Sequence, residues 1–151
     1  MNLNLLTLKD FLTMGAAVIG AVLGIMNTWN AMNQKKVRLR IVPAYSIMTA
    51  TGAVGFSIEV TNLSAFPVTI TEVGVTMPGM KRLYILEPFF ADKGDWPRRL
   101  EARSVVTAYF PVTDLLGAGQ RFGRAYAQTA CGERRYGTSK ALSEVRSQIS
   151  T

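Results

Sequence analysis

The sequence predicts one membrane-spanning helix followed by a small all-β domain, an antiparallel sandwich of about seven strands. Residues 11–32 carry no charged side chain, and a helix of about 20 apolar residues spans the hydrocarbon core of a bilayer. After residue 36 the hydrophobic pattern changes to the alternation typical of strands. We expect residues 1–34 to hold the helix and a short N-terminal tail, residues 35–139 the sandwich, and residues 140–151 a short C-terminal helix or tail.

The predicted helix has a face of small side chains. A capping-box pattern at Thr7 places its start near Leu8. Ala16, Gly20 and Gly24 are four residues apart, and the last two form a G-x-x-x-G pattern, which lets two helix backbones approach closely in a membrane. This face predicts packing against a second copy or another membrane protein. The predicted helix-packing residues are Ala16, Gly20, Gly24 and Asn27.

Charge on the two flanks of the helix predicts its orientation. On the N-terminal side of the uncharged segment 11–32 the only charged side chains are Lys9 and Asp10, so the whole net charge of +7 lies after this segment. The positive-inside rule then places the C-terminal domain in the cytoplasm and the N-terminus outside. A cleaved signal peptide is disfavoured because residues 1–7 carry no charged side chain. An external domain behind an N-in anchor remains an alternative. The residues expected at the membrane surface are Trp29, Lys35, Lys36, Arg38 and Arg40.

Alternating apolar residues predict the strands of the domain. We expect Pro43 to end the first strand, and a slip in the alternation near Glu72 predicts a bulge in the third. Residues 131–133 read as a hairpin turn, and residues 140–149 place apolar side chains at helical spacing. The predicted strands cover residues 36–41, 54–62, 68–75, 81–86, 103–110, 121–131 and 134–137.

The segment VTNLSAFPVTITEVGV resembles the second and third strands of immunoglobulin-like sandwiches found in many bacterial and phage membrane-anchored proteins. The shared pattern is a strand that ends in Asn, a turn that contains Ser, and an alternating strand that begins with Pro-Val. The resemblance implies an all-β antiparallel immunoglobulin-like sandwich that binds or scaffolds. Unlike antibody domains, the chain has no cysteine pair and no tryptophan in the expected core strand. The residues that carry the resemblance are Asn62, Ser64, Pro67, Val68 and Ile70.

Residues 88–100 form the longest predicted loop and combine three aromatic side chains with two arginines. Aromatic residues and arginine are enriched at the energetic centres of protein interfaces. The alternative interpretation is that the aromatic side chains cap the open end of the sandwich. The predicted partner-contact residues are Phe89, Phe90, Trp96, Arg98 and Arg99.

The composition argues against an enzyme. The chain has no histidine and one cysteine, so it lacks the commonest general base and metal ligand. Residues 92–95 lack the spacing of a calcium loop, and the scattered arginines come without a nucleic-acid-binding motif. We therefore expect no catalytic residue, no metal, no cofactor, no small-molecule substrate and no nucleic-acid partner.

The sequence predicts a membrane-anchored, non-enzymatic subunit or adaptor that binds protein partners through its helix and its sandwich. Its expected partners are membrane lipid and either another membrane protein or further copies of itself. The alternative is a self-oligomerising, membrane-perturbing or pore-forming protein, such as a phage lysis or exclusion factor. The small-residue face and the polar pair Asn27 and Asn30 support this alternative, because they would line a wet path.

Overall fold

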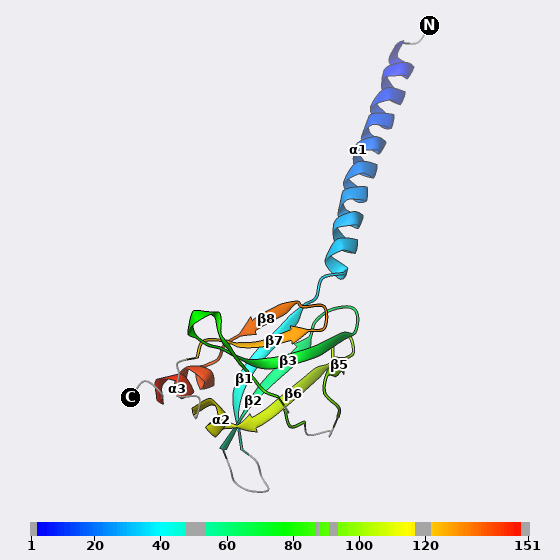
Figure 1. Cartoon of the computed structure of the whole chain (residues 1–151). Helices are drawn as coiled ribbons and strands as arrows, with labels where there is room; N and C mark the ends of the chain where they lie inside the picture. Colours follow the sequence, from blue (N-terminus) through cyan, green and yellow to red (C-terminus); the bar gives the residue numbers. More distant parts are fainter. Residues whose placement is uncertain (1–2, 48–53, 87, 91–93, 117–121, 149–151) are drawn as a thin grey trace. The chain divides into compact units, whose positions relative to one another are not determined.

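The computed structural model describes residues 3–47, 54–86, 88–90, 94–116 and 122–148. The chain forms two compact units, Met1–Lys36 and Val37–Thr151. The first holds one long helix and the second holds the β domain, and each is described by itself (Figure 1).

The N-terminal unit is the helix α1, Leu3–Gln34. It begins earlier than the predicted start near Leu8, so Thr7 lies inside the helix and not at its N-cap. Its segment Thr7–Gln34 is apolar and long enough to cross a membrane, and none of it is buried. Signal sequences near an N-terminus have the same length and apolar character. α1 therefore has the length and composition of a membrane-spanning helix.

The second unit contains two antiparallel sheets. One sheet has the strand order β1-β2-β6 and the other has the order β4-β3-β7-β8, with β5 also paired to β3. The strands are β1 Leu39–Ile47, β2 Val54–Asn62, β3 Val68–Thr76, β4 Arg82–Tyr84, β5 Arg98–Leu100, β6 Val105–Pro111, β7 Ala125–Thr129 and β8 Arg134–Gly137. A short 3-10 helix, η1, covers Pro78–Met80, and the α-helices of this unit are α2 Val112–Leu116 and α3 Lys140–Gln148.

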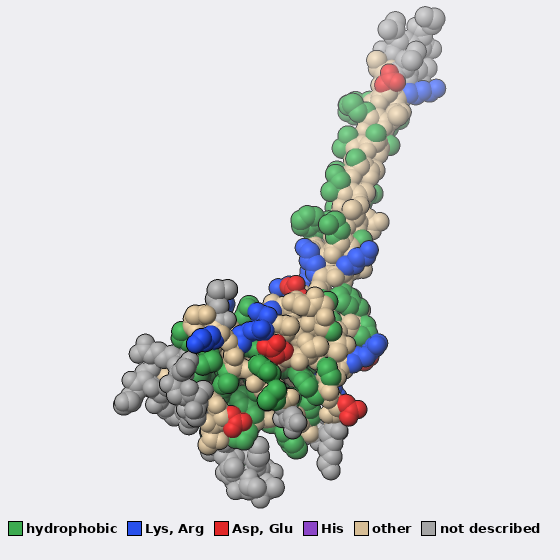
Figure 2. All heavy atoms as spheres, viewed as in Figure 1, with side chains coloured by type: hydrophobic (Ala, Val, Ile, Leu, Met, Phe, Trp, Pro, Cys, Tyr) green, Lys and Arg blue, Asp and Glu red, His purple; other side chains and the backbone are tan. Residues whose placement is uncertain are grey.

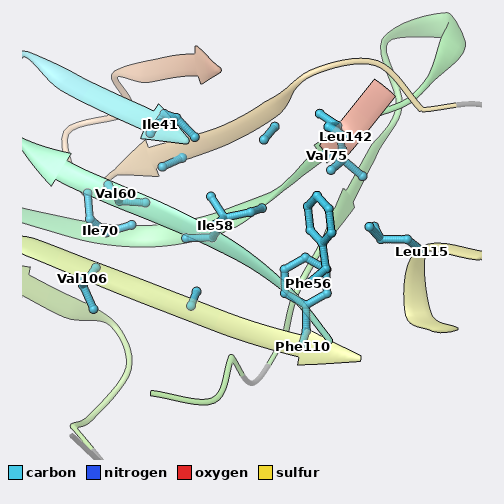
Figure 3. Close-up of a cluster of buried hydrophobic side chains, with 14 of the residues drawn as sticks. Ile41, Phe56, Ile58, Val60, Ile70, Val75, Val106, Phe110, Leu115 and Leu142 are labelled. Carbon is cyan, nitrogen blue, oxygen red and sulfur yellow. The ribbon is translucent and has the colours of Figure 1, made fainter. Parts of the chain in front are cut away.

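Alternation along the strands builds the core between the two sheets. Phe56, Ile58 and Val60 of β2 are fully buried, because every second side chain of a strand points to the same face. Figure 3 shows them beside buried side chains from both sheets. Burial of these apolar surfaces supplies the main stabilising term of the domain, at about 25 cal/mol per Å².

The predicted bulge in the third strand is confirmed. The register between β3 and β7 shifts between Ile70 and Glu72, so one extra residue changes which side chains face inward. Val73 and Val75 are consequently buried together with Ile70, although they fall in the opposite phase of the alternation.

The expectation that Pro43 ends the first strand is wrong. β1 continues to Ile47, and Pro43 pairs with Ile58 of β2. β1 is the terminal strand of its sheet, and proline is tolerated in an edge strand, where its missing N–H removes no ladder hydrogen bond.

Part of the predicted loop 88–100 is also a strand. Residues Arg98–Leu100 form β5, which pairs with the start of β3. Leu100 is buried, with an exposed fraction of 3%. A strand of three residues is too short to display a hydrophobic period, so only its pairing with β3 defines it.

The two α-helices of the domain close one end of the core. Leu115 of α2 and Leu142 of α3 are buried, and Figure 3 shows both at the end of the core where Phe56 lies. Ser139 caps α3, because its hydroxyl accepts a hydrogen bond from the Leu142 N–H at 3.2 Å. The apolar spacing in residues 140–149 therefore corresponds to a helix that docks on the sheets.

Candidate interaction surfaces

The small residues of α1 form an open face of the helix. Ala16, Gly20, Gly24 and Asn27 follow at spacings of four, four and three residues, which keeps them within one side of a 3.6-residue helix. A Cβ atom added at Gly20 or Gly24 meets nothing within 4 Å. The space above both glycines is thus free to receive another helix.

A shallow hollow lies next to this face. Thr28 donates a hydrogen bond from its hydroxyl to the Gly24 carbonyl at 2.9 Å, and Thr13 does the same to the Lys9 carbonyl at 2.8 Å. Both hydroxyls therefore have a hydrogen-bond acceptor within the helix. A neighbouring helix would contact this surface by apolar packing and not by hydrogen bonds to these hydroxyls. The hollow is lined by Ala21, Gly24, Ile25, Thr28, Trp29 and Met32.

The residues predicted at the membrane surface divide between the two units. Within the helical unit, the Lys36 ammonium lies 5.9 Å from the centre of the Trp29 ring. Within the domain, the Arg38 N–H donates to the Ser64 hydroxyl at 2.9 Å. Arg38 is thus fixed to the domain by its backbone. Arg40 is exposed and lies in β1, and Lys35 is exposed directly after the helix.

The aromatic residues of the segment 88–100 have different environments. Phe90 is buried in the core, with its ring stacked on Trp96 at 5.6 Å between centroids. Phe89 is 58% exposed and packs against Tyr109 of β6. Phe90 thus belongs to the core and Trp96 packs against it, whereas most of the Phe89 side chain is exposed, and its contact with a partner stays a prediction.

The two arginines of this segment belong to β5. The Arg98 guanidinium lies 5.9 Å from the Phe90 ring centre, and Arg99 forms an exposed ion pair with Glu101 at 3.0 Å. The backbone of Phe89 pairs with that of Tyr109 through hydrogen bonds of 2.9 and 3.0 Å. The segment is therefore held to both sheets by backbone pairing.

A surface that sequence analysis missed lies on the outer side of the sheet β4-β3-β7-β8. Tyr126 and Tyr136 are cross-strand partners with ring centres 6.4 Å apart. On β4, Tyr84 is 52% exposed. Figure 2 shows basic side chains on the domain surface over β7 and β8. We name this surface the tyrosine–arginine face and define it by Glu72, Arg82, Tyr84, Arg124, Tyr126, Gln128, Arg134 and Tyr136.

Charged side chains cover the buried tyrosine of this face. The Tyr126 hydroxyl donates a hydrogen bond to the Glu72 carboxylate, which also accepts from Arg82 at 3.0 Å. Burial is the largest cause that raises the pKa of Tyr126, and the hydrogen bond to Glu72 adds to it. Tyr126 thus stays protonated in the folded domain, and its hydroxyl donates a hydrogen bond to Glu72.

Two further arginines of the face are held by aromatic rings. The Arg124 guanidinium lies 4.8 Å from the Tyr136 ring centre, and that of Arg134 lies 5.7 Å from the Tyr126 ring centre. Arg134 also donates from Nε to the Gln128 Oε1 at 3.1 Å. Sequence reasoning had one available signal, the alternation of arginine and tyrosine in residues 124–126 and 134–136.

The last features of the domain are its potential metal ligands and its cysteine thiol. None of them form a group of three His, Cys, Asp or Glu side chains that could hold a metal ion. Cys131 is exposed, and a hydrogen bond with Thr129, 3.0 Å from Oγ1 to Sγ, is the main cause that lowers the pKa of its thiol.

Neither a protein-family model nor a curated protein matches the chain.

Proposed function

We propose that this protein is a single-pass membrane subunit or adaptor, with α1 as its anchor and the β domain as its binding module. The observation that carries the proposal is the contrast between the two units. The side chains of α1 over residues 7–32 are exposed, with Phe11 at 71% and Ile25 at 70%, whereas the domain has an apolar core of its own. Such an apolar helix is stable in lipid, where its backbone groups are satisfied internally.

The strand order supports an immunoglobulin-like sandwich as the binding module. In the immunoglobulin lettering that we propose, β1, β2 and β6 would correspond to strands A, B and E, and β3, β7 and β8 to C, F and G. β4 then takes the place of C′ beside C. Sandwiches of this kind serve recognition by their sheet faces, edges and loops in many cell-surface proteins.

The flanking charges support a cytoplasmic domain and an external N-terminus. Lys35 and Lys36 directly follow the helix, and Arg38 and Arg40 begin the domain. Such juxtamembrane basic residues are attracted to anionic lipid by about 1 kcal/mol each. Membrane lipid is therefore one proposed partner, and another membrane protein or a second copy of the chain is the other.

The first test asks whether α1 anchors the mature protein. Membranes from cells that express the full-length chain are extracted with alkaline carbonate, and the N-terminus of the retained protein is sequenced. The proposal expects the intact N-terminus in the carbonate-resistant pellet. A soluble product that begins after the apolar segment would identify a cleaved signal sequence and would overturn the anchor.

The second test asks what the anchored protein assembles with. The tagged full-length protein is purified in a gentle detergent, and the mass of the complex is determined. The proposal expects a discrete complex that contains other proteins. A pure homo-oligomer that releases dye from vesicles would instead establish the pore-forming alternative.

A further inference from the structure

We propose that the tyrosine–arginine face binds a carboxylate-bearing segment of a partner protein. The inference rests on the proposed adaptor function and names the chemistry of its partner. The face belongs to four paired strands, so its side chains are displayed from a rigid backbone. A surface of this kind is set before binding, which lowers the entropy cost of association.

The charges of the face are unbalanced. Three arginines stand against one glutamate, and that glutamate, Glu72, already pairs with Arg82 at 3.0 Å. In the part of the chain that the structure describes, the Arg124 guanidinium contacts a tyrosine ring, the Arg134 guanidinium contacts a tyrosine ring and Gln128, and neither is paired with a carboxylate. Two guanidinium groups therefore remain to be neutralised, and a carboxylate is the group that their planar donors fit.

Both arginines are held in place before a ligand arrives. A ring lies 4.8 Å from Arg124 and another lies 5.7 Å from Arg134. Arg134 is further fixed because Gln128 accepts from its Nε and Nη2 atoms, and its Nη1 group is left to donate elsewhere. Restricted arginines lose less side-chain entropy when they bind an anion than free ones do.

The composition of the face favours a protein partner over a lipid surface. All three cations are arginines, and three tyrosines lie among them, two of which are 43% and 52% exposed. Attraction to an anionic leaflet acts on lysine and arginine alike, whereas arginine and tyrosine together are typical of protein-binding hot spots. We therefore commit to an acidic protein segment as the occupant.

The test uses the full-length chain in nanodiscs of zwitterionic phosphatidylcholine, with a fluorescein-labelled peptide of eight glutamates as the probe. Anisotropy gives the affinity for the wild type and for Arg124→Gln, Arg134→Gln and Arg103→Gln, each of which removes one positive charge. Arg103 lies in the turn before β6 and outside the face. We expect the first two variants to bind about fivefold or more weakly, as for loss of a charge-assisted hydrogen bond, and Arg103→Gln to bind within about twofold of the wild type.

Two outcomes would overturn the inference. An equal loss in all three variants would show that only net charge attracts the peptide. The second outcome concerns nanodiscs that contain anionic phosphatidylglycerol. If the peptide no longer binds there, and if contact with the lipid depends on Arg124 and Arg134, the face binds the membrane and not a protein. Failure of the chain to enter nanodiscs would count against the membrane anchor, and the domain's binding to the peptide would then be measured in detergent.

Discussion

The Asn62 side chain forms hydrogen bonds with two turns that lie far apart in the sequence. Its side chain is fully buried, and its Nδ2 donates to the carbonyls of Phe66 at 2.9 Å and Glu101 at 3.0 Å. Its Oδ1 accepts from the Ser64 N–H at 2.9 Å. One side chain thus satisfies backbone groups that would otherwise be buried without partners.

We expect Asn62→Ala to lower the free energy of unfolding by about 3 kcal/mol, because each buried polar group left unpaired costs about 1–3 kcal/mol. Thr61→Ala, at the half-buried neighbouring position, serves as the control and should cost less than about 1 kcal/mol. Urea unfolding of the full-length protein in mild detergent, followed by near-UV circular dichroism, measures both. Equal effects of the two variants would contradict the role given to Asn62.

The raised pKa of Tyr126 predicts a pH dependence. Burial and the bond to Glu72 raise this pKa above the ordinary value of 10.0, so the folded state disfavours ionisation more than the unfolded state does. The contribution of Tyr126 to stability is fully present below pH 10 and is lost as the pH rises through the folded-state pKa.

We therefore expect Tyr126→Phe to cost about 1–2 kcal/mol at pH 7, where it removes a hydrogen bond to a carboxylate. The difference from the wild type should shrink as the pH rises above 10. Unfolding curves of both proteins between pH 7 and 11 test this expectation. Parallel stability profiles over that range would show that ionisation of Tyr126 is not coupled to folding.

At the scale of elements, the sequence predicts those features that local pattern determines. An uncharged apolar segment predicts a helix of membrane-spanning length, and alternation predicts β2, β3 and the β7–β8 hairpin. The bulge near Glu72 is visible because it breaks that alternation. Each of these signals lies within the segment that it describes.

Features that depend on distant pairing are not predictable in this way. β1 passes through Pro43 because it is an edge strand, and β5 exists because it pairs with β3. Phe90 and Phe89 are neighbours of the same type, yet one is buried and the other is exposed. The tyrosine–arginine face combines four strands, and only their register brings Tyr126 beside Tyr136.

The small-residue face of α1 gives a prediction about assembly. Leucines at Gly20 and Gly24 fit the isolated helix, since nothing lies within 4 Å of either added Cβ. Gly20→Leu/Gly24→Leu should therefore leave the helix intact and should block close contact with another helix. We expect the double variant to lose its assembly partner or its self-association, as measured by the mass of the complex in gentle detergent.

The matched control places the same residue type, at the same spacing, on the opposite side of α1. Val18→Leu/Val22→Leu adds apolar volume about half a turn away from the two glycines. The complex should keep its mass in this variant. Loss of assembly in both double variants would point to a general effect of bulk, and loss in neither would exclude the glycine face.

At the scale of the whole molecule, Cys131 offers a test of the proposed orientation of the protein in a membrane. It is the only cysteine in the sequence, and its side chain is exposed. The hydrogen bond with Thr129 lowers the pKa of its thiol, which increases the thiolate fraction that reacts with a maleimide near neutral pH. A single exposed thiol thus allows the wild-type chain to be labelled without added cysteines.

If the domain is cytoplasmic, a membrane-impermeant maleimide should not label Cys131 in intact cells. It should label Cys131 after the membrane is permeabilised. The control joins Cys131→Ser with Asn2→Cys, which moves the thiol to the other flank of α1 and should give labelling in intact cells. Labelling of Cys131 in intact cells, together with protection of the control, would establish an external domain. The proposed orientation rests on the positive charges that follow α1. An external domain would mean that these charges belong to the folded domain and do not determine the orientation of the helix.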